Sequence, residues 1–263
     1  MASHAQNVST VAPQLAVLDA HCHIDLYSDP VAVVSHAESL GIRTIAVTNA
    51  PSVFAHTRDL LANCRFARPA VGLHPELVHS HGHELELFWP FLEATRYVGE
   101  VGLDYVTSDR ELRAKQRHVF SAIVEQCAAR GDHHVLTIHS RRAAADVIAT
   151  IGSSFPGKAI LHWFSGSIRR LEQAVDAGFY FSVNTAMVLS KTGRTLVAAM
   201  PSDRVLTESD GPFVKVAQRP ATPADTGEVV GALARTWHVQ PHKAKEIVLS
   251  NLRNLLAESD RRA

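Results

Sequence analysis

The sequence has few of the features that mark several common protein classes. Its three cysteines, Cys22, Cys64 and Cys127, include no CxxC pair, which argues against a disulfide scaffold and favours a reducing compartment, the cytoplasm. No apolar run approaches the length of a membrane span, so we expect no membrane association. No GxGxxG or GxxxxGK(S/T) motif follows an apolar segment, which argues against the nucleotide-binding folds that use these loops.

Neither sign of charge predominates, because Lys plus Arg and Asp plus Glu both number 26. A chain without net charge has no long-range field that attracts nucleic acid, so any phosphate binding must come from local groups or from metal ions. The first residues are polar and lack the basic start and apolar centre of a signal peptide. We expect residues 1–14 to form a flexible tail and residues 15–263 to form a single domain.

Short apolar runs alternate with stretches of helical periodicity along the whole chain. The predicted strands are 15–24, 42–49, 70–74, 97–103, 134–139, 159–164, 179–183 and 204–207. The predicted helices are 30–40, 52–63, 84–93, 109–130, 142–151, 167–177, 191–200, 222–237 and 241–257. The alternation predicts an α/β fold with a parallel sheet covered by helices. Eight repeats favour a closed (β/α)8 TIM barrel over a doubly wound sheet.

Histidines and carboxylates gather at the carboxyl ends of the predicted strands. Asp19, His21 and His23 alternate along the first strand, so they share one face, which in a barrel is the interior, while Cys22 faces the helices. Such a pair of histidines is by itself equally typical of a structural site. The later strand ends add the following residues: His74, Glu100, His139, His162, Glu208 and Asp210. These strand ends meet at the face where barrel enzymes carry out chemistry.

Glu100 is the most informative of these residues. It lies in an apolar run between Val98 and Val101, where a carboxylate needs a partner to stay charged. An interior arginine could supply the opposite charge, but no basic residue lies on these strand ends. A bound cation is therefore the favoured partner.

Taken together, the motifs resemble the TatD family of metal-dependent deoxyribonucleases, which have amidohydrolase-type barrels. The resemblance extends over residues 18–256, and its motifs together are highly specific. They are Asp19-Ala-His-Cys-His23, Gly72-Leu-His-Pro75, Gly99-Glu-Val-Gly-Leu-Asp-Tyr105, Ile138-His-Ser-Arg141, Leu161-His-Trp-Phe-Ser-Gly166 and Thr207-Glu-Ser-Asp210.

The resemblance implies a hydrolase that cleaves DNA phosphodiester bonds, on single strands or at strand ends, with two divalent cations (Mg, Mn or Zn). The residues implied as ligands of the first cation are His21, His23, Glu100 and Asp210. Glu100 would bridge to the second cation, which His139 and His162 would also hold. Asp210 and Glu100 would be catalytic, with Asp210 as the general base.

Four further residues are expected around these ligands. His74 would face the substrate phosphate, and Arg141, two residues after His139, is expected to contact it too. Asp19 and Glu208 are expected to orient the ligands. Trp163 and Phe164 could either stack a base or pack between barrel and helices.

Several details resemble one branch of the family, the TatD-like component (QatD) of the Qat anti-phage defence system. These are Leu73-His-Pro-Glu-Leu77, His139-Ser-Arg-Arg-Ala143, His162-Trp-Phe-Ser-Gly-Ser167, Asp203-Arg-Val-Leu206 and Asn251-Leu-Arg253. The branch implies a role in defence, possible contacts with other defence subunits, and DNA as a partner. Residues 212–223 lack the Asn-Glu-Pro segment common in the family, so the substrate wall near this loop is not predicted.

Two other functions remain open on the sequence. A small-molecule amidohydrolase or lactonase would use the same barrel, but many of these enzymes bridge their metals with a lysine on the fourth strand, where this chain has Glu100 and no lysine. The other is a binding subunit of a defence complex with little catalysis. The complete set of expected ligands argues against it.

Overall fold

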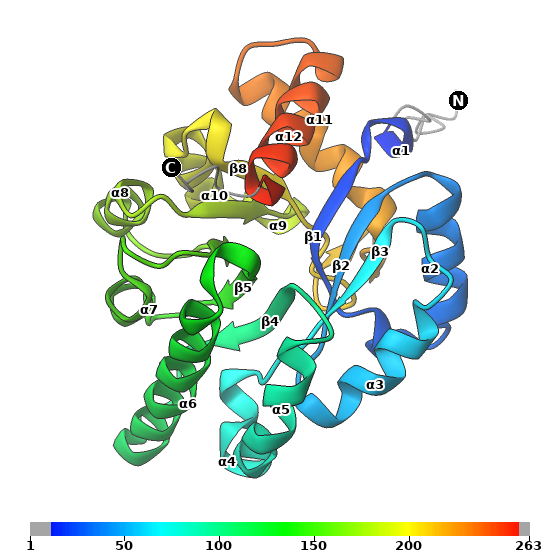
Figure 1. Cartoon of the computed structure of the whole chain (residues 1–263). Helices are drawn as coiled ribbons and strands as arrows, with labels where there is room; N and C mark the ends of the chain where they lie inside the picture. Colours follow the sequence, from blue (N-terminus) through cyan, green and yellow to red (C-terminus); the bar gives the residue numbers. More distant parts are fainter. Residues whose placement is uncertain (1–11, 258–263) are drawn as a thin grey trace, which may run out of the picture.

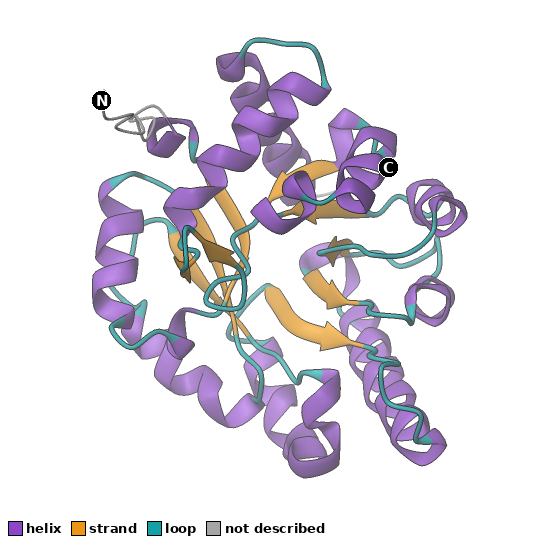
Figure 2. Ribbon diagram, turned by 180° about the vertical axis from the view of Figure 1, so that it is seen from behind, coloured by secondary structure: helices purple, strands orange, loops and turns teal. Residues whose placement is uncertain are grey.

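A computed structural model describes residues 12–257 of the chain (Figure 1). Parallel strands form its centre and helices surround them, as the reverse view also shows (Figure 2). The central strands are β1 (Leu18–Cys22), β2 (Arg43–Val47), β3 (Ala67–Ala70), β4 (Tyr97–Gly102), β5 (Val135–His139), β6 (Lys158–His162), β7 (Tyr180–Val183) and β8 (Val205–Thr207). The strands form two groups, β1-β2-β3 and β4-β5-β6-β7-β8, and within each group every strand pairs in parallel with its sequence neighbours.

Local hydrogen bonds join these two groups into a closed barrel. A parallel bridge between Val71 and Val98 links the end of β3 to β4. On the other side, the Thr207 hydroxyl at the end of β8 donates to the Leu18 carbonyl of β1. The Asp210 amide then donates to the His21 carbonyl at 2.9 Å. The predicted (β/α)8 TIM barrel is thus confirmed.

The helices lie outside the barrel, and some of them begin at a residue whose side chain caps the first turn. The Asp29 carboxylate caps α2, and the Asp109 carboxylate caps the long α6, because each accepts hydrogen bonds from amides of the first turn. The helices are α1 (Ala12–Leu15), α2 (Pro30–Ser39), α3 (Pro51–Leu60), α4 (Val78–His81), α5 (Leu85–Leu92), α6 (Arg110–Ala129), α7 (Ala144–Ile151), α8 (Ile168–Asp176), α9 (Thr185–Leu189), α10 (Lys191–Ala199), α11 (Thr226–Thr236) and α12 (Pro241–Leu256).

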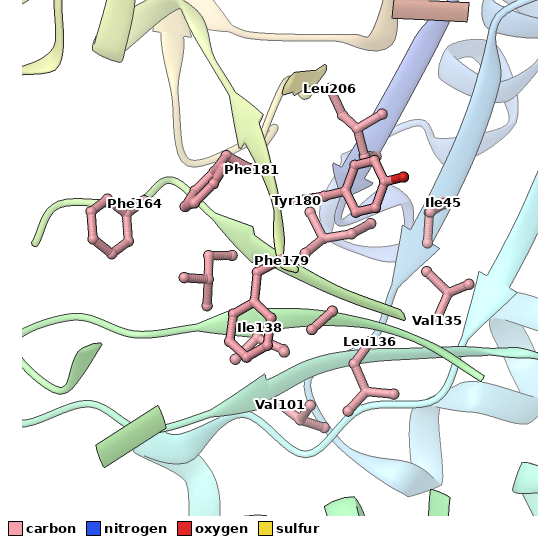
Figure 3. Close-up of a cluster of buried hydrophobic side chains, with 14 of the residues drawn as sticks. Ile45, Val101, Val135, Leu136, Ile138, Phe164, Phe179, Tyr180, Phe181 and Leu206 are labelled. Carbon is pink, nitrogen blue, oxygen red and sulfur yellow. The ribbon is translucent and has the colours of Figure 1, made fainter. Parts of the chain in front are cut away.

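The core fills the space between strands and helices. Figure 3 shows part of it, where Val101, Ile138 and Phe181 come from three strands and belong to one fully buried cluster. Burying such a side chain contributes about 1.5–3 kcal/mol. Cys22 packs in a separate cluster with Val34 of α2, which confirms that its thiol faces the helices. Among the described residues, no helix has the length and apolar character needed to cross a membrane.

The third strand differs from its prediction. The structure places β3 at Ala67–Ala70, whereas the predicted strand 70–74 is mostly the connection that follows it. Gly72 explains the shift: its amide donates to the Thr48 hydroxyl, and a Cβ there would lie 1.9 Å from the Thr48 carbonyl oxygen. The chain therefore passes too close to β2 for any larger residue. His74 lies beyond the strand end and not at it.

Other differences concern the chain ends and short elements. Most of the predicted tail 1–14 lies outside the described residues, but residues 12–14 belong to α1. The sequence patterns also missed α4, α9 and a short antiparallel hairpin, β9 (Lys215–Val216) and β10 (Arg219–Pro220). The hairpin fills the segment after β8 that departs from the family pattern.

Candidate metal centre

The carboxyl end of the barrel brings the predicted ligands together around one carboxylate. Glu100, on β4, is buried and contacts imidazoles from four other segments of the chain. These imidazoles belong to His21, His23, His74, His139 and His162. Residues separated by more than a hundred positions in the sequence therefore share one site.

The first ligand cluster consists of His21, His23 and Asp210, which lie within 4.8 Å of one another by their ligand atoms. The Asp210 Oδ1 atom lies 3.9 Å from His21 Nε2 and 3.6 Å from His23 Nε2. Glu100 Oε2 lies 3.4 Å from the first nitrogen and 3.3 Å from the second. All four side chains are buried.

The second ligand cluster gathers around the other oxygen of Glu100. Its Oε1 atom lies 2.8 Å from His139 Nδ1, 3.0 Å from His162 Nε2 and 3.4 Å from His74 Nε2. The structure thus brings His74 as near to Glu100 as the predicted ligands. Its expected role as a substrate contact stays a prediction.

The charges in the site depend strongly on one another. Burial by itself would raise the pKa of Glu100, but His74, His162 and His21 hold that pKa well below its ordinary value. Burial by itself would lower the pKa of His162, yet Glu100 and Glu208 hold it well above its ordinary value. Burial lowers the pKa of His21 to about 3, with help from His162. Protons and cations therefore compete for the same nitrogen atoms.

Asp19 and Glu208 hold the backbone around the first cluster. The Asp19 carboxylate accepts hydrogen bonds from the Ser209 amide at 2.9 Å and from the Ser209 hydroxyl. The Glu208 carboxylate accepts from the Trp163 amide at 3.1 Å and from the Asn184 side chain at 2.9 Å. Burial raises the pKa of Asp19 to about 7 and raises that of Glu208 as well. These contacts suit the orienting role predicted for both residues.

Two contacts of the ligands were not predicted. Asp104 Oδ2 lies 2.8 Å from His139 Nε2, and the Thr137 hydroxyl lies 2.7 Å from His21 Nδ1. Each fixes the ring so that its other nitrogen faces Glu100. Asp104 stands in the quoted family motif, which could have suggested it, whereas a threonine inside an apolar strand gives no such signal. Gly102 makes room here, because a Cβ would lie 2.1 Å from the His139 carbonyl oxygen.

The donor set fits divalent cations. His21 Nε2 and both ring nitrogens of His23 are buried and have no hydrogen-bond partner within residues 12–257. A buried polar atom without a partner is costly, and a cation held jointly with Glu100 and Asp210 would remove that cost. Mixed imidazole and carboxylate donors suit Zn, Mn and Mg without selecting among them. The buried clusters are therefore consistent with a binuclear metal site.

A cavity of about 550 Å³ opens over the two clusters. Arg141 lines it beside His139, and its expected contact with the substrate stays a prediction. Trp163 lines it too, whereas Phe164 is 1% exposed and packs against Phe181. Phe164 therefore packs in the core, which is one of the two predicted alternatives, whereas Trp163 lies at the cavity. Phe213, which no sequence pattern identified, also lines the cavity.

The chain matches the TatD related DNase family over residues 18–257. It belongs to this family. The metal-dependent hydrolase YjjV of Escherichia coli (strain K12), described as uncharacterized, is 27% identical over 250 residues, which are 90% of this chain and 95% of YjjV. Human deoxyribonuclease TATDN3 is 26% identical over 220 residues, 76% of this chain and 80% of its own length.

Solved structures agree on the fold. The crystal structure of YjjV, a TatD homolog, superposes with a TM-score of 0.80 at 24% identity and covers 92% of this chain and 98% of its own. The E. coli phosphotriesterase homology protein, complexed with phosphate in its active site, gives 0.60 at 12% identity over 93% and 99% of the two chains. This TatD-family chain thus has the barrel of the metal-dependent hydrolases. None of these relatives bears on the predicted QatD branch or defence role.

Proposed function

We propose that this TatD-family protein hydrolyses phosphodiester bonds of DNA, on single strands or at strand ends. The observation that carries the proposal is Glu100, whose two carboxylate oxygens each face a separate ligand cluster at the base of one cavity. When bound, two divalent cations would activate water and neutralise charge on a phosphate. Deoxyribonuclease names among the relatives, such as human TATDN3, support this choice of substrate.

Two sets of residues would hold the two cations, and one of these residues would also accept a proton from the attacking water. His21, His23, Glu100 and Asp210 would hold the first cation, and Glu100, His139 and His162 the second. Asp210 lines the cavity, so its carboxylate is placed to accept the proton of the attacking water. Glu100 lies between the clusters and would hold both sets of ligands in fixed positions relative to each other.

Contacts with the substrate would come from other residues that line the cavity. The Arg141 guanidinium can pair with phosphate oxygens, and His74 Nε2 faces the same cavity from the connection after β3. Asp19 and Glu208 would keep β8 and the Trp163 amide in place through the hydrogen bonds described above.

The test is the release of nucleotides from labelled single-stranded DNA by the purified protein with Mn²⁺, Mg²⁺ or Zn²⁺. Glu100→Ala and His162→Ala should abolish release while circular dichroism shows an intact fold. Full activity in either variant would refute the assignment of these residues. Cleavage of a lactone or cyclic amide in place of DNA would favour the small-molecule hydrolase instead.

The QatD-like role in anti-phage defence, the contacts with other defence subunits and the cytoplasmic location stay predictions that rest on the sequence motifs. A phage-challenge assay with wild-type protein and with Glu100→Ala would test the defence role. Protection that survives this substitution would point to the binding-subunit alternative.

A further inference from the structure

The mouth of the cavity carries two aromatic side chains that the proposed chemistry does not use. Trp163 is 37% exposed and Phe213 is 58% exposed. Among all described Phe, Tyr and Trp residues, these two alone are exposed, and both line the cavity over the ligand clusters. Apolar surface that is kept in water beside a site indicates a ligand that covers it.

Trp163 is held in the cavity wall by its backbone. Its φ is 38°, a conformation that costs energy for a residue with a side chain. The Trp163 amide donates to the buried Glu208 carboxylate at 3.1 Å, which fixes this conformation. As a result, Trp163 lines the cavity, while Phe164 enters the core, where Figure 3 shows it near Phe181.

Phe213 lines the cavity from the segment that follows β8. It follows the turn at Asp210, whose carbonyl accepts a hydrogen bond from the Phe213 amide at 3.0 Å. Its ring stands edge-to-face with the His23 ring, with centroids 4.9 Å apart and an angle of 84° between the planes. One aromatic surface therefore adjoins a proposed ligand of the first cation.

Two pairs of residues that line the cavity differ in their chemistry. Trp163 follows β6 and Phe213 follows β8, whereas Arg141 follows β5 and His74 lies between β3 and β4. The second pair suits phosphate oxygens, and the first pair offers ring faces of the kind that stack nucleobases.

We propose that Trp163 and Phe213 stack the nucleobases next to the cleaved phosphate, so that cleavage depends on contacts to the bases as well as to the phosphates. This inference rests on the proposed function and assigns its base contacts to two residues that the proposed chemistry does not use. A base inside a duplex has both faces covered by its neighbours, so only a single strand or a frayed end can offer a face to these rings.

The experiment compares two strands of equal length, one ordinary single-stranded DNA and one built wholly of abasic nucleotides. Both carry the same phosphates, so only base contacts differ. We expect the wild-type protein to favour the ordinary strand in kcat/KM by roughly 5- to 150-fold for each stacked base.

Matched variants assign this preference to the rings. Trp163→Leu and Phe213→Leu keep an apolar side chain but remove the ring, and each should bring the preference towards one. Trp163→Phe keeps a ring and should retain most of the preference. Leu87→Ala, at an apolar side chain of α5 that is 51% exposed and does not line the cavity, should match wild type. A preference unchanged in both leucine variants would overturn the inference.

The two proposals fail in different ways. If wild type cleaves neither strand, the proposed function is wrong and the inference falls with it. If wild type cleaves both strands equally, the nuclease stands and base stacking is refuted. A binding readout makes this independent of turnover: fluorescence anisotropy of labelled DNA with Asp210→Asn should give tighter binding to a single strand than to a blunt duplex, and equal binding would contradict base stacking.

Discussion

The two ligand clusters share Glu100 but are held in different ways. His21, His23 and Asp210 are fixed by the backbone that closes the barrel, since the Asp210 amide donates to the His21 carbonyl and the His23 amide to the Gly211 carbonyl, both at 2.9 Å. In the second cluster, the side chains of His74 and His139 are 13% and 15% exposed and face the cavity. Apart from Asp210, which lines the cavity, the first cluster is thus the more deeply buried, and the second is the more open to ligands, although its His162 is buried.

Because of this contrast, we expect the two clusters to differ in how tightly they bind their ions. A site that is held firmly before an ion binds loses little entropy on binding, so the more deeply buried first cluster should bind its ion more tightly than the more exposed second cluster. The open cluster adjoins Arg141 and the cavity, where substrate must arrive. We therefore expect a firmly held ion in the first cluster and a more readily exchanged ion at the second.

The largest effect should come from the residue common to both clusters. Glu100→Gln removes the charge that faces all five imidazoles and should lower nuclease activity by about 10³-fold or more. Metal analysis should also find fewer than two bound ions per chain. His23→Ala is the matched control, because it should weaken only the first site. A Glu100→Gln protein with two bound ions and normal turnover would erase the proposed contrast.

Removal of metal should separate the clusters next. Brief dialysis against a chelator should release the ion of the second cluster first, and longer treatment should release the other. Refilling the sites stabilises the fold, by about 2.7 kcal/mol for each site at an ion concentration one hundred times its Kd. Thermal melting during stepwise addition of Mn²⁺ or Zn²⁺ measures this gain. Simultaneous release of both ions would contradict the difference in preorganisation.

Asp104 offers a way to weaken one cluster alone. Asp104→Asn removes the carboxylate beside His139 Nε2, and loss of such a supporting contact typically weakens metal binding by about 10- to 100-fold. The second ion should be affected and the first should not. Isothermal titration with Mn²⁺ reads both affinities, and equal weakening of the two sites would show that the clusters are not independent.

The smallest effect concerns the ion pair between Arg219 of the hairpin and Asp225 in the turn that follows it. Arg219 donates two hydrogen bonds of 2.7 Å to Asp225, and burial, which would raise the pKa of Asp225, is outweighed by these contacts, which lower it. Because the folded pKa is depressed, the pair stabilises the fold at pH values above the ordinary aspartate pKa of 3.8, and this contribution is lost as pH falls through the folded pKa.

Asp225→Asn should therefore cost roughly 1 kcal/mol at pH 7, since Arg219 is 53% exposed. The difference from wild type should vanish in strong acid, and both ions should still bind. Asp59→Asn, in the exposed pair with Arg58, is the control and should change almost nothing. Urea unfolding at several pH values measures these differences, and a constant difference down to low pH would show that the ion pair is not its source.

The ligand set could be predicted because polar side chains at apolar strand ends are visible in the sequence. His21 and Glu100 interrupt apolar runs and Asp210 follows the end of one, and the repeat of strands and helices predicts that these strand ends converge. The position of β3 could not be predicted in this way, because its displacement depends on how closely Gly72 approaches Thr48. Residues 70–74 look like a strand in composition alone.

Supporting residues were harder to predict than ligands. Thr137 and Ser182 are ordinary members of apolar strands. Thr137 meets His21 only because β5 faces β1, and the Ser182 hydroxyl donates to the Glu208 carboxylate only because β7 lies beside β8. The two aromatic neighbours Trp163 and Phe164 have the same composition pattern, and only the left-handed backbone of Trp163 sends them in opposite directions. Contacts across the barrel thus carry information that periodicity lacks.

The closure of the barrel has a consequence for synthesis of the protein. Ser209 and Asp210 complete the site begun by Asp19 and His21, nearly two hundred residues earlier. A nascent chain still lacking β8 has neither its proposed general base nor one wall of its first ion pocket. The proposed first ion pocket therefore cannot be completed until translation of the chain has passed Asp210.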